Sequence, residues 1–176
     1  MLKRLVPWIA LVAGIAMITY LIALYAVPGV IMRMAVSRIA DRGGMNQMAH
    51  APMTTAESRT IVRPSPDLAY SSCPFDLGKG AVTVTVMPVA APYWSLSVYD
   101  SQTNAVFVRN DREVRGQPVR IAIARQGQTI PAGYVPVWVD GNRGVALLRI
   151  LVPNAGAFPA IDAARKASAC QVATPS

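Results

Sequence analysis

The side chains best suited to chemistry gather in one short segment, residues 63–77. It places a guanidinium, a carboxylate, a phenol and a hydroxyl close together, at Arg63, Asp67, Tyr70 and Ser71. Such a set can bind a polar ligand, or it can satisfy backbone groups at turns and sheet edges. The structural role is favoured because turns use these residue types routinely. A polar pocket comes second, and a catalytic role has the least support.

The motifs that usually mark an enzyme are missing from this chain. It contains no GxSxG, no Walker-type phosphate loop and no HExxH. The single histidine, His50, lies in a polar stretch that we expect to be a linker, where an exposed residue is commoner than a base. Asp67 and Asp76 are near in sequence, but nothing places them together as a catalytic pair. We therefore expect no catalytic residue, and an enzyme is the less favoured class.

The two cysteines, Cys73 and Cys170, have no CxxC spacing. With one histidine they supply too few ligands for a tetrahedral metal site, so we expect no metal and no cofactor. A covalent bond between them would restrain the C-terminal end of the chain, and it predicts an oxidising compartment such as the periplasm. Free buried cysteines are the alternative, because cysteine also packs as a small hydrophobe.

The elements that would position these groups are mostly short strands. Residues 82–86 alternate valine with threonine, and residues 93–99 alternate again. Turn-forming groups separate four further strand candidates, at residues 105–109, 119–124, 134–139 and 145–152. A helix is predicted over residues 158–169. This order predicts a mainly β domain, an antiparallel sandwich or a partly closed barrel, with a short C-terminal helix.

The N-terminal part of the chain is long and apolar. Between Arg4 and Arg33 no residue is charged, and about 20 apolar residues are enough to cross a bilayer once. An uncleaved signal anchor is favoured over a cleaved signal peptide, whose apolar region is only about 7–15 residues long. Residues 1–29 are therefore predicted to be a transmembrane signal anchor, with Trp8 and Tyr25 at the two interfaces.

The chain after the anchor divides into two parts. Pro28 and the glycine after it are expected to end the anchor, because proline removes a helical donor. Residues 30–42 predict an amphipathic helix, which either lies on the lipid surface or packs beneath the folded domain. Residues 30–60 are accordingly assigned to a juxtamembrane helix and linker, and residues 61–176 to the β domain.

The formal net charge of +8 suggests an anionic partner. Half of it flanks the apolar run, where it can meet lipid headgroups. The other charges are interspersed without a basic stripe, so we expect the lipid bilayer as a partner and no nucleic acid. The basic residues on the two sides of the run nearly balance, so charge does not fix orientation. The cysteines favour a single-pass protein of the bacterial inner membrane with its C-terminal domain in the periplasm.

Residues 63–77 and the strands after them resemble a bacterial family, domain of unknown function 1254. The resemblance covers residues 63–169, and the family's asparagine before the proline–aspartate pair is Ser65 here, which weakens an inherited binding role. The strand at residues 93–100 is similar too, with Thr103 and Asn104 after it. The residues that carry the main pattern are Arg63, Pro66, Asp67, Tyr70, Ser71, Asp76, Leu77 and Gly80.

This resemblance implies an exported, mostly β domain that works beside a second domain, domain of unknown function 1214. The chain is too short to contain both, so a companion membrane-anchored envelope protein is expected to supply it. The favoured function is a binding or assembly module, and the alternative is an envelope enzyme or half-enzyme completed by the companion. The candidate binding residues are Arg63, Asp67, Tyr70, Ser71, Asp100 and Asn104.

Overall fold

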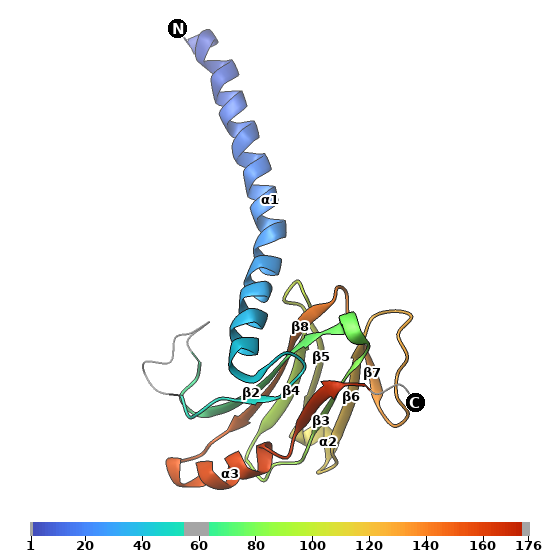
Figure 1. Cartoon of the computed structure of the whole chain (residues 1–176). Coiled ribbons are helices and arrows are strands. Elements are labelled where there is room, and N and C mark those ends of the chain that lie inside the picture. Colours follow the sequence, from blue (N-terminus) through green and yellow to red (C-terminus); the bar gives the residue numbers. More distant parts are fainter. Residues whose placement is uncertain (1, 55–63, 174–176) are drawn as a thin grey trace.

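A long helix leads into two β-sheets that pack face to face (Figure 1). The computed structural model describes residues 2–54 and 64–173, with side chains from residue 5 onward. A short helix lies near the C-terminal end of the described chain. The mainly β class is confirmed, and two separate sheets correspond to a sandwich rather than to a closed barrel.

The first helix, α1, runs without interruption over Leu2–Gly43. The break expected at Pro28 is therefore wrong. Proline costs a helical hydrogen bond, but the turns after it are held in place because Met32 and Val36 are buried against Val145 of the first sheet. The predicted anchor and juxtamembrane helix are one element, and its last turns pack on the folded domain.

The N-terminal part of α1 stands clear of the sandwich (Figure 1). Its large apolar side chains from Leu5 to Val27 are all exposed. By length and composition the helix can cross a membrane, with a mean hydropathy of 2.3 in its apolar window. Together with the disulfide between Cys73 and Cys170, this helix indicates an extracytoplasmic domain.

The first sheet is antiparallel, with the order β1-β2-β8-β4-β5. One face packs on the core, and the last turns of α1 cover part of the other face. We call that second face the outer face. The strands are β1 (Ala49–His50), β2 (Leu68–Asp76), β8 (Arg143–Leu151), β4 (Trp94–Tyr99) and β5 (Ala105–Asn110).

The second sheet has the order β7-β6-β3-β9, with β6 and β7 parallel and the other pairs antiparallel. Its strands are β7 (Val135–Trp138), β6 (Val119–Ala124), β3 (Val82–Val86) and β9 (Ala169–Val172). The short helical elements are η1 (Leu77–Lys79), α2 (Asp111–Val114), η2 (Ala155–Ala157) and α3 (Phe158–Arg165).

The core lies between the two sheets and follows the alternation of the strands. The three valines of β3 are fully buried, and so are Leu96 and Leu148 of the first sheet. A disulfide joins Cys73 of β2 to Cys170 of β9, with the Cα atoms 6.3 Å apart. The predicted disulfide is confirmed, and it links one sheet covalently to the other.

The C-terminal helix is shorter than the sequence predicts. It ends at Arg165, and Ala169 begins β9, where Cys170 pairs with Val84 of β3. The helix predicted through Ala169 is therefore wrong at its end. A four-residue strand is too short to show a period, and here pairing with β3 outweighs the helix preference of the alanines before it.

Strand β2 is also absent from the sequence prediction, although it spans Leu68–Asp76. Its serines and Pro74 hide the alternation. The carbonyl of Pro74 accepts from the amide of Asn46, 2.8 Å away, on the side of β2 where β1 has already ended. The N–H that proline lacks falls on that same side, so the ladder to β8 loses no hydrogen bond.

Candidate functional site

The predicted binding residues occupy two separate places in the fold. Asp67, Tyr70 and Ser71 lie at the beginning of β2, whereas Asp100 and Asn104 lie in the turn between β4 and β5. The strand registers place these two groups at opposite ends of the first sheet. Arg63 lies outside the described residues. The described members therefore do not form one common pocket.

Asp100 and Asn104 form hydrogen bonds that hold the turn between β4 and β5 in shape. Asp100 is buried, and its carboxylate accepts from the amides of Gln102 and Asn104 at 2.8 and 2.9 Å. Its second oxygen accepts from the side-chain amide of Asn104 at 2.8 Å. These bonds shape the β4–β5 connection, where Thr103 has a positive φ of 66°. The contacts favour the structural role for Asp100 and Asn104.

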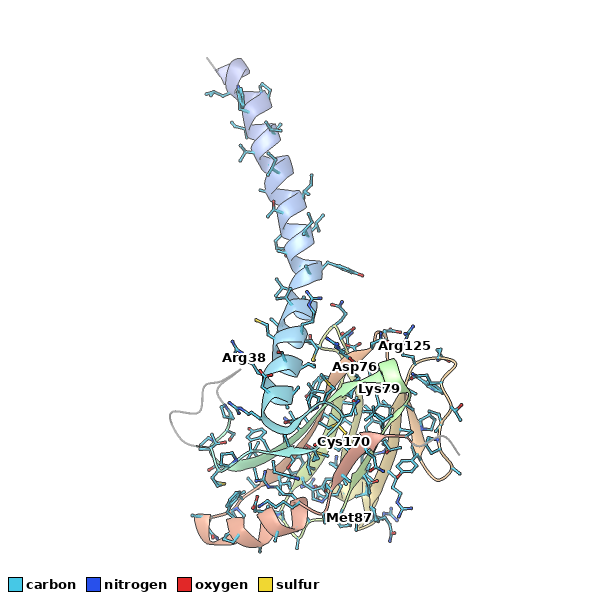
Figure 2. The ribbon with its side chains drawn as sticks, viewed as in Figure 1. Arg38, Asp76, Lys79, Met87, Arg125 and Cys170 are labelled. Carbon is cyan, nitrogen blue, oxygen red and sulfur yellow. A yellow bond between two sulfur atoms is a disulfide. The ribbon has the colours of Figure 1, made fainter. Side chains whose placement is uncertain are left out.

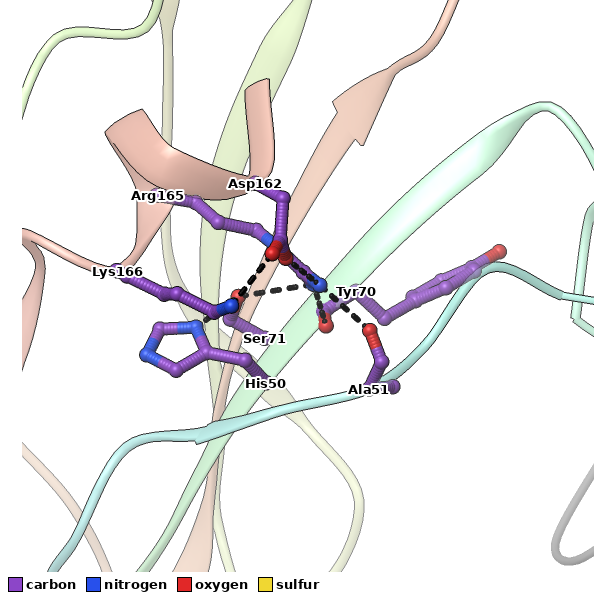
Figure 3. A network of polar contacts seen from close by, with 7 residues as sticks. All are labelled: His50, Ala51, Tyr70, Ser71, Asp162, Arg165 and Lys166. Carbon is purple, nitrogen blue, oxygen red and sulfur yellow. Dashed lines mark hydrogen bonds and ion pairs between the residues drawn. The ribbon is translucent and has the colours of Figure 1, made fainter. Parts of the chain in front are cut away.

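A polar network that the sequence does not reveal lies at the beginning of β2 (Figure 3). Its centre is Arg165 of α3, which is 1% exposed. The guanidinium donates to the carbonyls of Tyr70 and Ala51 at 2.5 and 2.6 Å. It also donates to the Asp162 carboxylate at 2.5 and 2.8 Å, and to Ser71 Oγ at 3.4 Å. We call these residues, with His50, the Arg165 cluster.

His50 is part of this cluster, so the expectation of an exposed linker residue is wrong. It lies in β1, opposite Ser71, and its Nδ1 is 2.9 Å from Ser71 Oγ. Burial lowers the pKa of His50, and the nearby Arg165 lowers it further. Part of the predicted linker is thus paired with β2. The reason is that the backbone and side chain of Asn46 both bond to that strand.

The Arg165 cluster joins three segments, and the hydroxyl of Ser71 within it is closed to solvent. Ser71 is 1% exposed and already hydrogen-bonded, so it lacks the access that a nucleophile needs. The guanidinium instead bridges α3, β2 and the strand that follows α1. The nearest sequence signal is the three-residue spacing of Asp162 and Arg165, which suits an ion pair on one face of a helix.

The lowered pKa of His50 predicts a pH-dependent stability. The unfolded chain binds the proton more readily, because its histidine keeps a pKa near 6.5. Above pH 6.5 the protonation of His50 therefore costs no stability. Below pH 6.5 the free energy of unfolding decreases as the pH falls through the lower pKa of the folded state. In His50→Gln, the melting temperature should lose this slope below about pH 6.5. An unchanged slope would contradict the assignment. Asp76 and Asp162 do not obscure it, since their own pKa values lie below 3.8.

A row of polar side chains crosses the outer face of the first sheet. In the strand registers, Arg149 of β8 lies between Tyr70 of β2 and Ser95 of β4, and Ser95 lies opposite Asn110 of β5. These side chains point away from the core because their strand neighbours, such as Leu148, are core residues. We call these four residues the outer-face row.

The centre of this row contains two unpartnered polar atoms. Arg149 Nε and Ser95 Oγ are both buried without a hydrogen bond to any described residue. None of the described carboxylates forms an ion pair with Arg149. Buried polar atoms normally form hydrogen bonds. Two buried polar atoms without a partner therefore indicate that an acceptor is missing at this place.

Apolar side chains flank the row on the same face. Leu147 of β8 is half-buried, and across Ser97 from it Val108 of β5 is 49% exposed. Val106, which the register between β4 and β5 leaves unpaired, is 38% exposed. A buried polar centre beside exposed apolar groups is the composition of a protein-binding surface.

Comparisons with known proteins bear on the family and the fold. The model of a family described as "Protein of unknown function (DUF1254)" matches residues 45–172. No curated protein matches the chain. The crystal structure of the VPA0106 protein from Vibrio parahaemolyticus is similar, with a TM-score of 0.66 and 15% identity, and the match covers 85% of this chain and 36% of that one. An uncharacterised protein from Burkholderia cenocepacia matches with a TM-score of 0.47 and 14% identity, covering 86% of this chain and 42% of that one.

Proposed function

Since the chain belongs to the DUF1254 family of proteins of unknown function, we propose that it is a membrane-tethered binding module. In this proposal α1 is the tether and the sandwich is the binding domain. The outer face of the first sheet docks a companion protein outside the cytoplasm. The chemistry of that face, rather than the family name, supports the proposal.

The observation that carries the proposal is the unpartnered pair at the centre of the outer-face row. Arg149 Nε and Ser95 Oγ are already desolvated, so a partner that supplies an acceptor there gains hydrogen bonds at little further desolvation cost. A carboxylate fits best, because a guanidinium binds it with two parallel bonds. Val108 and Leu147 would then contact apolar side chains of the same partner.

The expected partner is a membrane-anchored envelope protein that carries domain of unknown function 1214. The chain spans about a third of the length of the related Vibrio structure, so that protein contains further chain beside the shared fold. A separate companion would supply an equivalent neighbour here. The part of the outer face that α1 leaves open, where the half-buried Arg149 lacks a partner at Nε, is a suitable place for it to dock.

We assign the protein to the bacterial inner membrane, with a single span and the sandwich in the periplasm. The exposed apolar helix supports the tether, and the disulfide supports an oxidising compartment. Thiol labelling after acid quenching and denaturation of the cells tests this location, because both cysteines are buried in the folded chain. Cys73 and Cys170 should remain unlabelled without reductant, and a labelled Cys73 would contradict the assignment.

Two substitutions test the docking face. Arg149→Gln removes the charge at its centre, and Val108→Lys places a charge on its apolar flank. Each should lower co-purification of the 1214-domain companion from detergent-solubilised membranes at least tenfold, because a central contact contributes roughly 2 kcal/mol or more and a buried unpaired charge on the flank is costly. Quantitative mass spectrometry measures the ratio of companion to chain.

Matched controls separate docking from folding. Arg120→Gln removes an exposed arginine from the second sheet, and Val135→Lys charges an exposed valine there. Both controls should keep the wild-type ratio. The docking face is rejected if all four variants behave alike, or if Arg149→Gln and Val108→Lys lose the companion only to the extent that they unfold.

A further inference from the structure

A cavity of about 370 Å³ lies where α1 reaches the sandwich. It is lined on one side by Gly29 and Arg33 of the helix. On the other side lie Asp76 at the end of β2, Gln102 of the β4–β5 turn, and Arg143 at the start of β8. The cavity therefore belongs to the end of the sandwich from which the tether projects, away from the outer-face row.

The residues that line the cavity have more hydrogen-bond donors than their own acceptors can bind. Asp76 accepts from the amide of Gly78 at 2.9 Å and from Arg143 Nε at 2.7 Å, and these bonds lower the pKa of the carboxyl. None of the described carboxylates forms an ion pair with Arg33, and Arg143 keeps its two terminal nitrogens for another acceptor. Two guanidinium groups beside the amide of Gln102 suit a phosphate.

The surroundings add positive charge to the same end of the sandwich. Lys79 of η1 and Arg125 after β6 lie beside Asp76 at this end (Figure 2). Arg125 donates to Asn142, a lining residue, at 2.8 Å. The acidic groups near the cavity are Asp76, which is already paired, Asp140, and Asp100, whose buried carboxylate accepts from the amides of Gln102 and Asn104. The cavity therefore favours an anion.

The length of α1 places this cavity at the level of lipid headgroups. The uncharged run before Arg33 has 28 residues, from Leu5 to Met32, and spans roughly 42 Å at about 1.5 Å per residue. A bilayer with its headgroup regions is about 40–45 Å thick. Tyr25, which is 83% exposed, lies about 6 Å before Gly29 and suits the interface where aromatic rings collect.

We infer that this cavity binds the phosphate of an anionic lipid headgroup in the leaflet on the domain's side. The inference rests on the proposed membrane tether. Arg33 and Arg143 contact the phosphate oxygens, and Gln102 donates a further hydrogen bond. The bound headgroup fixes the tilt of the sandwich against the bilayer, and thereby the direction in which the outer face is presented.

Native mass spectrometry of the full chain in detergent tests the inference with a defined probe. The chain is loaded with phosphatidylglycerol or phosphatidylcholine, and retained lipid is counted. The wild type should retain phosphatidylglycerol at least fivefold better than phosphatidylcholine. The double variant Arg33→Gln/Arg143→Gln should lose this preference. The double variant Arg112→Gln/Arg120→Gln removes the same charge from exposed positions and should keep it.

Several outcomes would overturn the inference. Equal retention by the two double variants, or no preference in the wild type, removes the site. Displacement of the lipid by millimolar inorganic phosphate would show a site for soluble phosphate instead. A chain that leaves the membrane without detergent would refute the tether. Companion co-purification from the Arg33→Gln/Arg143→Gln variant should stay at the wild-type level, so failure of the cavity is distinguishable from failure of the docking face.

Discussion

Replacing Arg165 with methionine should lower the free energy of unfolding of the sandwich by about 3–5 kcal/mol. Methionine fills much of the same volume but donates no hydrogen bond. The carbonyls of Tyr70 and Ala51 would then lose a fully buried donor, and the carboxylate of Asp162 would keep only its pair with Lys166. Urea unfolding of the full chain in detergent, followed by tryptophan fluorescence, measures the loss.

A neighbouring lysine provides the control for this prediction. Lys166 pairs with the same carboxylate, but its side chain is 57% exposed. Exposed pairs contribute little, so Lys166→Met should cost less than about 1 kcal/mol. Similar losses for the two variants would show that the Arg165 cluster is not the bond between α3 and β2 that we describe.

Removing the disulfide should cost at least as much. The bond closes a loop between residues 97 positions apart, for which chain entropy predicts a stabilisation of roughly 4–5 kcal/mol. The double variant Cys73→Ala/Cys170→Ala should therefore unfold at clearly lower urea than the oxidised wild type. The effect acts on the unfolded chain, because the link between the sheets limits how far they can separate.

The reduced wild type is the internal control for that experiment. Dithiothreitol should move its unfolding midpoint to that of the double variant, and it should not move the midpoint of the double variant. A wild type that unfolds identically with and without reductant would contradict a stabilising disulfide. A double variant that responds to reductant would reveal an artefact of the assay.

The sequence predicts several strands of this fold, because apolar and polar residues alternate along a strand that buries one face. Val82–Val86 and Val119–Ala124 match their predicted bounds, since their inward residues are apolar. The sequence also predicts the disulfide, with free buried cysteines as the alternative, and Cys73 and Cys170 are bonded in the fold. The helix predicted over residues 30–42 does end there, at Gly43, because Gly44 adopts a φ of 89° that glycine tolerates best.

The sequence hides the parts that depend on contacts between distant segments. Strand β2 carries serines and a proline that disguise its period, and its ladder to β8 becomes visible only in the fold. Arg165 looks like an ordinary basic residue at a helix end, yet it lies buried against residues more than 90 positions away. Arg149 is similar, since only the strand register places it beside Ser95 with both atoms unpartnered.

The most direct test of the docking face is site-specific photo-crosslinking in intact cells. A photoreactive amino acid replaces Val108 on the outer face, or Gln171, an exposed residue of the second sheet. We predict a crosslinked product with the 1214-domain companion at position 108 and none at position 171. Equal products at both positions, or a companion that co-purifies but crosslinks only from position 171, would contradict a binding module that uses the outer face.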